Sequence, residues 1–214
     1  MEFKVTYYQK NEERWNVLSH ALGVLLSVVA FPFLIIKASK TDDPLVLLSF
    51  IIYGLSMIVL YTASTLYHSA ENQKIRYYLN IFDHSAIYIL IAGTYAPVAL
   101  VVLQGTVGWL IFGLSWLFAF IGVFYKIYFI GRFKTISVIT YVAMGWMIVF
   151  AINPLLENLS TPGLRLMLMG GVFYSIGAVF FAFPKIPYNH AIFHVFVLLG
   201  SLSHFIAIYR FVLE

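Results

Sequence analysis

Cysteine is absent from the 214 residues of this sequence, and charged residues are scarce, at 10% of the chain. The missing cysteine excludes disulfides and thiolate ligands, so any metal ion must be held by nitrogen and oxygen atoms. The low charge, together with 62% hydrophobic residues, excludes an ordinary soluble domain. The composition is typical of an integral membrane protein.

Seven stretches are long and apolar enough to cross the hydrocarbon core as helices, which needs about 20 residues each. They are residues 16–37, 45–68, 79–103, 108–128, 135–152, 164–183 and 190–212. Short polar connections separate them, and too little chain remains for a second domain. The sequence therefore predicts an all-α, polytopic membrane protein, with a single seven-helix transmembrane domain over residues 1–214 and a short cytoplasmic segment at 1–15.

Nine of the thirteen basic residues fall on the side that holds the amino terminus and the connections after the even-numbered stretches. They are Lys4, Lys10, Arg14, Lys74, Arg76, Lys126, Arg132, Lys134 and Lys185. The positive-inside rule predicts a cytoplasmic amino terminus and an outside carboxyl terminus. Anionic lipid at the cytoplasmic surface explains the net charge of +4, so the expected partner is membrane lipid and nucleic acid is excluded.

Polar side chains within the apolar stretches gather at one depth. His68 ends the second stretch, Asp83 and His84 lie in the first turns of the third, and His190 and His194 open the seventh. With the predicted orientation, all five lie near the cytoplasmic surface. Ionisable groups are costly in hydrocarbon, so those that face the protein interior are candidates for function.

Three of these histidines are candidate metal ligands. His190 and His194 are four residues apart and share a helix face, so both can reach one ion. Adding His68 gives the ligand count of an open catalytic zinc site, with water in the fourth position. Asp83 would orient or deprotonate that water, or complete the ligand shell, and Ser64 could hydrogen-bond the water, the aspartate or a substrate carbonyl. Zinc is the first choice of metal, non-haem iron is the alternative, and a buried polar network is the alternative to any metal.

Hydrolysis of a carbonyl compound is the reaction that suits such a site, because zinc lowers the pKa of bound water to about 7. A site just inside the cytoplasmic interface favours a lipid amide or ester as the substrate. His84 and His204 are predicted to form ordinary hydrogen bonds between helices. His20 is expected either beside the metal ligands or at the membrane interface.

Four segments of the chain resemble the hemolysin III family, the bacterial branch of the progestin and adipoQ receptor family in a group that includes alkaline ceramidases. They are EERWNVLSH at 12–20, STLYH at 64–68, NIFDHSAIYILIAGTYAP at 80–97 and NHAIFHVFVLLGSLSH at 189–204. The resemblance implies seven helices with a cytoplasmic amino terminus, in the bacterial cytoplasmic membrane. It also implies a zinc ion held by His68, His190 and His194, with Ser64 and Asp83 beside it, lipid amidase chemistry, and a cytolytic activity that no residue explains.

Three functions remain as hypotheses. The first is a zinc-dependent membrane hydrolase that cleaves a lipid amide or ester, with Asp83 as the base. The second is a membrane sensor or homeostasis protein with a structural or regulatory zinc, and the third is a cytolysin that perturbs bilayers. Lipid is the expected partner, and a second copy of the chain is a further candidate. Asp83 distinguishes the first two, because it is needed to activate water and dispensable if the histidines only hold helices together.

Overall fold

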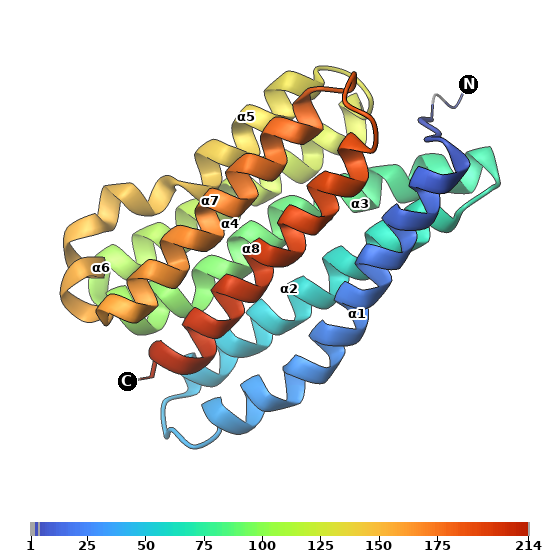
Figure 1. Ribbon diagram of the computed structural model, residues 1–214. Helices are drawn as coiled ribbons and strands as arrows, with labels where there is room; N and C mark the ends of the chain where they lie inside the picture. The colour runs from blue at the N-terminus through green and yellow to red at the C-terminus, as the bar shows by residue number, and fades with distance from the viewer. Residues whose placement is uncertain (1–2, 4, 214) are drawn as a thin grey trace.

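The chain forms a bundle of seven long helical spans (Figure 1). The computed structural model describes residue 3 and residues 5–213, and every regular element within these residues is a helix. The predicted all-α class and the seven spans are therefore confirmed. The elements are α1 (Lys10–Ala38), α2 (Pro44–Ser69), α3 (Gln73–Pro97) with its π-helical continuation η1 (Val98–Leu103), α4 (Gly105–Phe129), α5 (Lys134–Gly145), the 3-10 segment η2 (Met147–Ala151), α6 (Ile152–Asn158), α7 (Thr161–Ala182) and α8 (Asn189–Phe211).

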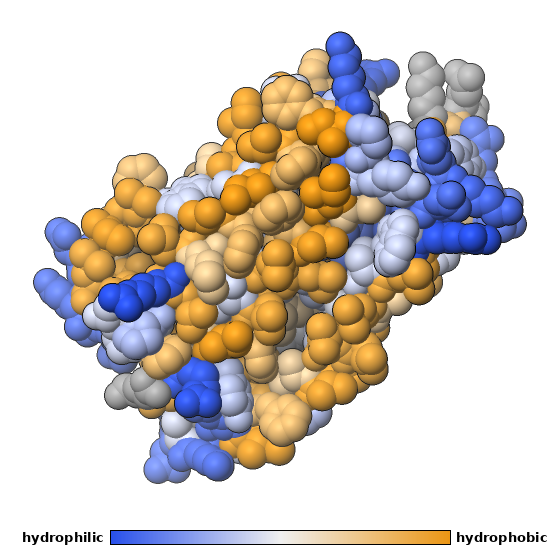
Figure 2. All heavy atoms as spheres, viewed as in Figure 1, coloured by the Kyte–Doolittle hydropathy of each residue, from blue (hydrophilic) through white to orange (hydrophobic). Residues whose placement is uncertain are grey.

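The surface of the bundle is apolar around its middle. Figure 2 shows a broad hydrophobic band between two hydrophilic ends. Large hydrophobic side chains point outward along the helices, including Leu25 on α1 at 60% exposure and Phe120 on α4 at 62%. An apolar surface of this extent would be unfavourable in water, whereas lipid chains solvate it. The surface fits an integral membrane protein.

Two helices begin six residues earlier than predicted. α1 begins at Lys10 instead of residue 16, and α3 begins at Gln73 instead of residue 79. The first turns of both helices are too polar to read as membrane spans. These turns are helical nevertheless, and an ion pair between Glu13 of α1 and the buried Arg76 of α3 joins them. Hydropathy alone cannot reveal a pair between residues so far apart in sequence.

The fifth span is interrupted and ends later than predicted. α5 stops at Gly145, and α6 carries the span to Asn158 instead of residue 152. At the interruption, the hydroxyl of Tyr95 on α3 donates to the carbonyl oxygen of Gly145 at 2.9 Å and accepts from the N–H of Ile148 at 3.0 Å. Backbone groups inside a membrane need partners within the protein. A side chain from another helix therefore stabilises the interruption.

α1 lies beside both helices that carry the candidate metal ligands, since it packs against α2 and against α8. Gly23 on α1 leaves room for the ring of Tyr61 on α2. The hydroxyl of Tyr61 in turn donates to Ser201 on α8 at 2.7 Å. The starts of α1 and α8 lie at the same end of the bundle, opposite the end of α8 (Figure 1). This end carries the candidate site.

Candidate metal centre

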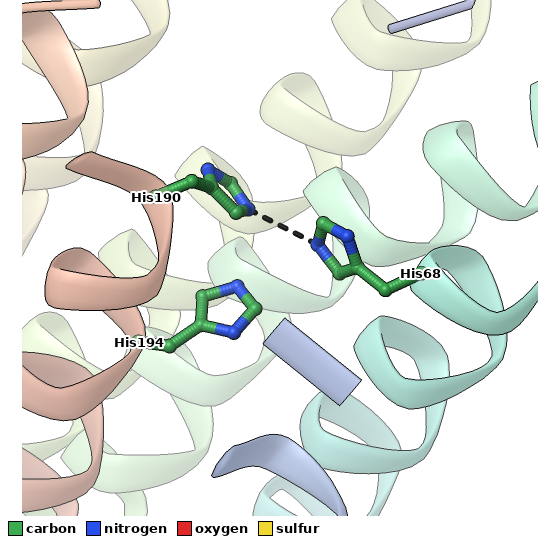
Figure 3. Close-up of side chains that lie close together, drawn as sticks. All are labelled: His68, His190 and His194. Atoms are coloured by element: carbon green, nitrogen blue, oxygen red, sulfur yellow. Dashed lines mark hydrogen bonds between the residues drawn. The ribbon is translucent and has the colours of Figure 1, made fainter. Parts of the chain in front are cut away.

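Three buried histidines lie together where α2 ends and α8 begins (Figure 3). His68, His190 and His194 are 4%, 3% and 1% exposed, and one ring nitrogen of each lies within 4.8 Å of the others. The Nε2 atoms of His68 and His190 are 3.1 Å apart. The predicted meeting of the second and seventh spans at these residues is confirmed. Three buried imidazoles this close together could hold a metal ion.

The Nδ1 atom of each histidine points to a partner near the start of the chain. His68 Nδ1 lies 2.7 Å from the Glu13 carboxylate, and His194 Nδ1 lies 3.2 Å from the carbonyl oxygen of Asn16. Both partners accept, so both Nδ1 atoms carry the hydrogen and both Nε2 atoms keep their lone pairs. His190 Nδ1 lies 3.0 Å from the hydroxyl of Tyr8. Burial raises the pKa of Tyr8, so this hydroxyl keeps its proton at neutral pH.

These contacts fit a metal ion between the rings. Two Nε2 ligands of a tetrahedral zinc ion, each about 2.05 Å from the metal, lie roughly 3.3 Å apart, close to the 3.1 Å between His68 and His190. Without a cation, His190 Nε2 must donate to His68, which requires its Nδ1 to accept from Tyr8. That arrangement satisfies two rings, but the Nε2 of His194 forms no hydrogen bond within residues 5–213. The three ring nitrogens could therefore hold a cation, and the spacing of the His68 and His190 Nε2 atoms fits one.

Glu13 of α1 contacts the candidate metal ligand His68. Its carboxylate accepts from His68 and also pairs with Arg76, which is 2% exposed. A carboxylate on the far nitrogen of a ligating histidine fixes the tautomer and makes the ring a better ligand. Arg76 in turn donates to carbonyl oxygens at the end of α2, including that of Tyr67 at 3.2 Å. This network joins α1, α2 and α3 at the position of His68.

Replacing Glu13 with Gln is expected to weaken zinc binding by about 10-fold to 100-fold, because His68 loses the charged acceptor that orients it. Competition of the purified protein with a fluorescent chelator measures this change. The exposed Glu71→Gln is the matched control and should bind zinc as the wild type does. Equal zinc affinity in folded Glu13→Gln and wild-type protein would contradict this role.

His20 lies beside the cluster rather than at the membrane interface. It is 3% exposed, and its ring stacks on His194 with centroids 3.6 Å apart and planes 8° apart. It also meets Tyr61 edge-on at 5.1 Å. Neither of its ring nitrogens has a hydrogen-bond partner within residues 5–213, and it is outside the three-histidine set. His20 therefore holds the ring of His194 in place by packing.

The remaining two histidines differ from each other. His204 donates through Nε2 to the carbonyl oxygen of Met167 on α7 at 3.0 Å, which confirms its predicted interhelical bond. The ring of His84 instead bonds to the carbonyl oxygen of Asn80 in its own helix at 3.0 Å, so the interhelical prediction for this ring was wrong. A carbonyl one turn earlier offers a nearer partner than any other helix. The same nitrogen lies 3.6 Å from Asp83.

A largely apolar cavity of about 320 Å³ lies beside the cluster, a size typical of ligand sites. His190 and His194 line it, together with Asp83 of α3 and Ser64 of α2. Both polar side chains are buried, and the Ser64 hydroxyl has no hydrogen-bond partner within the described part of the chain. Among the described residues, the group that could hold a metal ion consists of the three histidines and contains no carboxylate. The structure thus brings Asp83 and Ser64 to the wall of the cavity without adding them to that set.

The sequence matches a known family over nearly its whole length. Residues 8–205 match the family model described as Haemolysin-III related. The chain belongs to this family. It is 45% identical over 210 residues to Hemolysin-3 of Bacillus cereus, covering 98% of this chain and 95% of that protein. It is 45% identical over 197 residues to the Hemolysin-3 homolog of Bacillus subtilis (strain 168), covering 92% of each. Human Monocyte to macrophage differentiation factor is 28% identical over 222 residues, covering 98% of this chain and 87% of that protein.

Family membership confirms the resemblance drawn from the four segments. Together with the seven apolar helices, it makes this haemolysin-III-related chain an integral protein of the bacterial plasma membrane. Four residues at the centre, Tyr8, Glu13, Asn16 and Arg76, were not among the predicted site residues. Tyr8 lies before the first helix and carries no recognisable signal, and Arg76 reads as one of many basic residues near the membrane surface. Glu13 and Asn16 lie in the segment at 12–20, which carries part of the family resemblance, but neither residue was assigned a role.

Proposed function

We propose that the chain is a zinc-dependent membrane hydrolase that cleaves a lipid amide or ester, with zinc held by His68, His190 and His194. The observation that carries the proposal is the group of three buried imidazoles at the wall of an apolar cavity. Imidazole donors without any thiolate suit zinc. Bound zinc would act as a Lewis acid on the carbonyl oxygen of the substrate. The cavity would hold the apolar part of that substrate.

The roles of the other residues follow from their positions on the cavity wall. The carboxylate of Asp83 would accept the proton of the attacking water at Oδ and later return it to the leaving group. The hydroxyl of Ser64, which lacks a partner among the described residues, would donate a hydrogen bond to the substrate carbonyl. The mostly hydrophobic lining would exclude bulk water from the reacting groups.

The proposed orientation puts this site near the cytoplasmic surface. It rests on the excess of basic residues at the amino terminus and the connections on the same side. The histidine cluster lies at the end of the bundle where α1 and α8 begin, so it shares that side. A substrate would then be drawn from the cytoplasmic leaflet.

A structural or regulatory zinc is the second candidate function. It is favoured by the contacts of the three histidines, which join α2 and α8 to Tyr8, Glu13 and Asn16 at the start of the chain. An ion here would hold three segments together whether or not a reaction occurs. Two relatives are named hemolysins, so cytolysis is a third candidate, and dye release from lipid vesicles tests it.

Turnover of defined lipids tests the proposal. Purified protein should release fatty acid from a panel of lipid amides and esters, and chelation of the metal should abolish that release. Comparison of lipids in cells with and without the protein identifies the substrate class. Bound zinc without turnover on any panel member and without a change in cellular lipids would favour the second candidate.

A further inference from the structure

A second cavity, of about 500 Å³, lies next to the first. The segment before α1, the start of α5 and the connection between α7 and α8 form its walls. In contrast to the apolar cavity, it presents many polar side chains. These are Thr6, Tyr8, Gln9, Glu12, Lys134, Thr135, Lys185, Tyr188 and Asn189. We call this second cavity the vestibule.

Phe181 and Val138 mark the place where the two cavities meet, because both residues line each of them. The ring of Phe181 packs against His190 and Phe193, with centroids 5.5 Å and 5.1 Å apart. On the vestibule side, Tyr8 reaches His190 Nδ1. A molecule that extends from one cavity into the other therefore passes the candidate metal centre.

The charges of the vestibule favour an anion. Lys134 and Lys185 are exposed and form no ion pair within residues 5–213. Glu12 is buried, and its carboxylate already accepts the backbone N–H of His190 at 3.2 Å. That contact places the negative charge at the start of α8, where the helix dipole stabilises it. The two lysines are left to bind an acidic group of a ligand.

We propose that the vestibule binds a phosphate-bearing polar group of the lipid whose acyl chain lies in the apolar cavity. This inference rests on the proposed function and specifies the substrate class, an amphiphile with an anionic headgroup. Lys134 and Lys185 bind the phosphate oxygens through charge-assisted hydrogen bonds. Phe181 packs along the lipid where its apolar and polar parts meet, so the scissile carbonyl lies beside His190.

Equilibrium binding to full-length protein in nanodiscs of neutral lipid tests this inference. Three probes are compared: a single-chain lipid amide with a phosphate group, the same lipid with a hydroxyl in its place, and inorganic phosphate. We expect the phosphate-bearing lipid to bind about tenfold more tightly than the uncharged lipid, as two partly exposed ion pairs would provide. The double variant Lys134→Gln/Lys185→Gln should lose this preference. Lys74→Gln, exposed on the same side but outside the vestibule, should retain it.

Several outcomes would overturn the inference. Equal affinity for the charged and uncharged lipids would show that the vestibule does not select an anion, and an equal loss in Lys74→Gln would show only general attraction to the surface. Inorganic phosphate binding as tightly as the phosphate-bearing lipid would assign the lysines to a free anion. The measurement needs no turnover, so hydrolysis of a neutral lipid by the wild type would still support the proposed function if the headgroup preference were absent.

Widening the junction of the two cavities gives an independent readout. Phe181→Ala removes the ring at this junction, and a hydrophilic chelator should then remove the metal several times faster than from the wild type. Phe183→Ala, which changes an exposed phenylalanine two residues away, should leave the rate unchanged. Equal rates for Phe181→Ala and the wild type would show that Phe181 does not limit access to the centre from the vestibule.

Discussion

Replacing His190 with Ala is expected to remove the metal ion from the protein. Two remaining imidazoles, His68 and His194, rarely retain zinc at ordinary concentrations, so the content should fall from about one ion per chain to near zero. The unfolding temperature in detergent should also fall, because a ligand that binds only the folded state stabilises it. Elemental analysis and thermal unfolding of the purified variant measure both effects. The backbone contact between His190 and Glu12 does not involve the deleted ring, so the start of α8 should still form.

His204→Ala is the matched control for this variant. His204 lies on the same helix as His190. Its ring bonds to the carbonyl oxygen of Met167, and the residue is not part of the histidine cluster. This control should keep its zinc while losing some stability through the missing hydrogen bond. Full zinc content in the His190 variant, or equal zinc loss in both variants, would show that His190 is not a ligand.

Replacing Asp83 with Asn is expected to abolish turnover and to leave the metal in place. The substitution keeps the shape of the side chain but removes the group that accepts the proton. Loss of a general base typically lowers the rate by about 10²-fold to 10⁴-fold. Zinc content should stay at the wild-type value, because the clustered set consists of three histidines and no carboxylate. Initial rates on a cleaved lipid, together with elemental analysis, separate the two effects.

Asp42→Asn, at an exposed position between α1 and α2, is the control for the loss of one carboxylate. It should match the wild type in rate and in zinc content. A metal-free Asp83→Asn protein would mean that Asp83 is a ligand, contrary to the role proposed here. Unchanged turnover in Asp83→Asn would remove Asp83 from the mechanism and show that another group accepts the proton of the attacking water.

The spans and the histidine cluster could be predicted because each depends on local spacing. Long apolar runs predict membrane helices from the sequence alone. His190 and His194 share a helix face because they are four residues apart. His68 could be added because the second and seventh spans bring their polar ends to the same depth. These predictions require only the direction in which each helix crosses the membrane. They do not require knowledge of which helices pack together.

Features that depend on a partner far away in sequence could not be predicted. The polar first turns of α1 and α3 are helical, and the ion pair between Glu13 and Arg76 joins them. The Tyr95 hydroxyl on α3 stabilises the break after Gly145, a contact that the sequence of the fifth span does not show. Tyr8 reaches His190 across 182 positions of sequence. Pairings of this kind are set by the packing of helices, which hydropathy does not report.

The zinc content of purified wild-type protein tests the central claim most directly. We predict about one zinc ion per folded chain after loosely bound metal has been removed, and near zero in His68→Ala prepared in the same way. Folded, monodisperse wild-type protein that stays free of transition metal after zinc has been supplied would contradict the account. Equal zinc in the wild type and the His68 variant would contradict it as well.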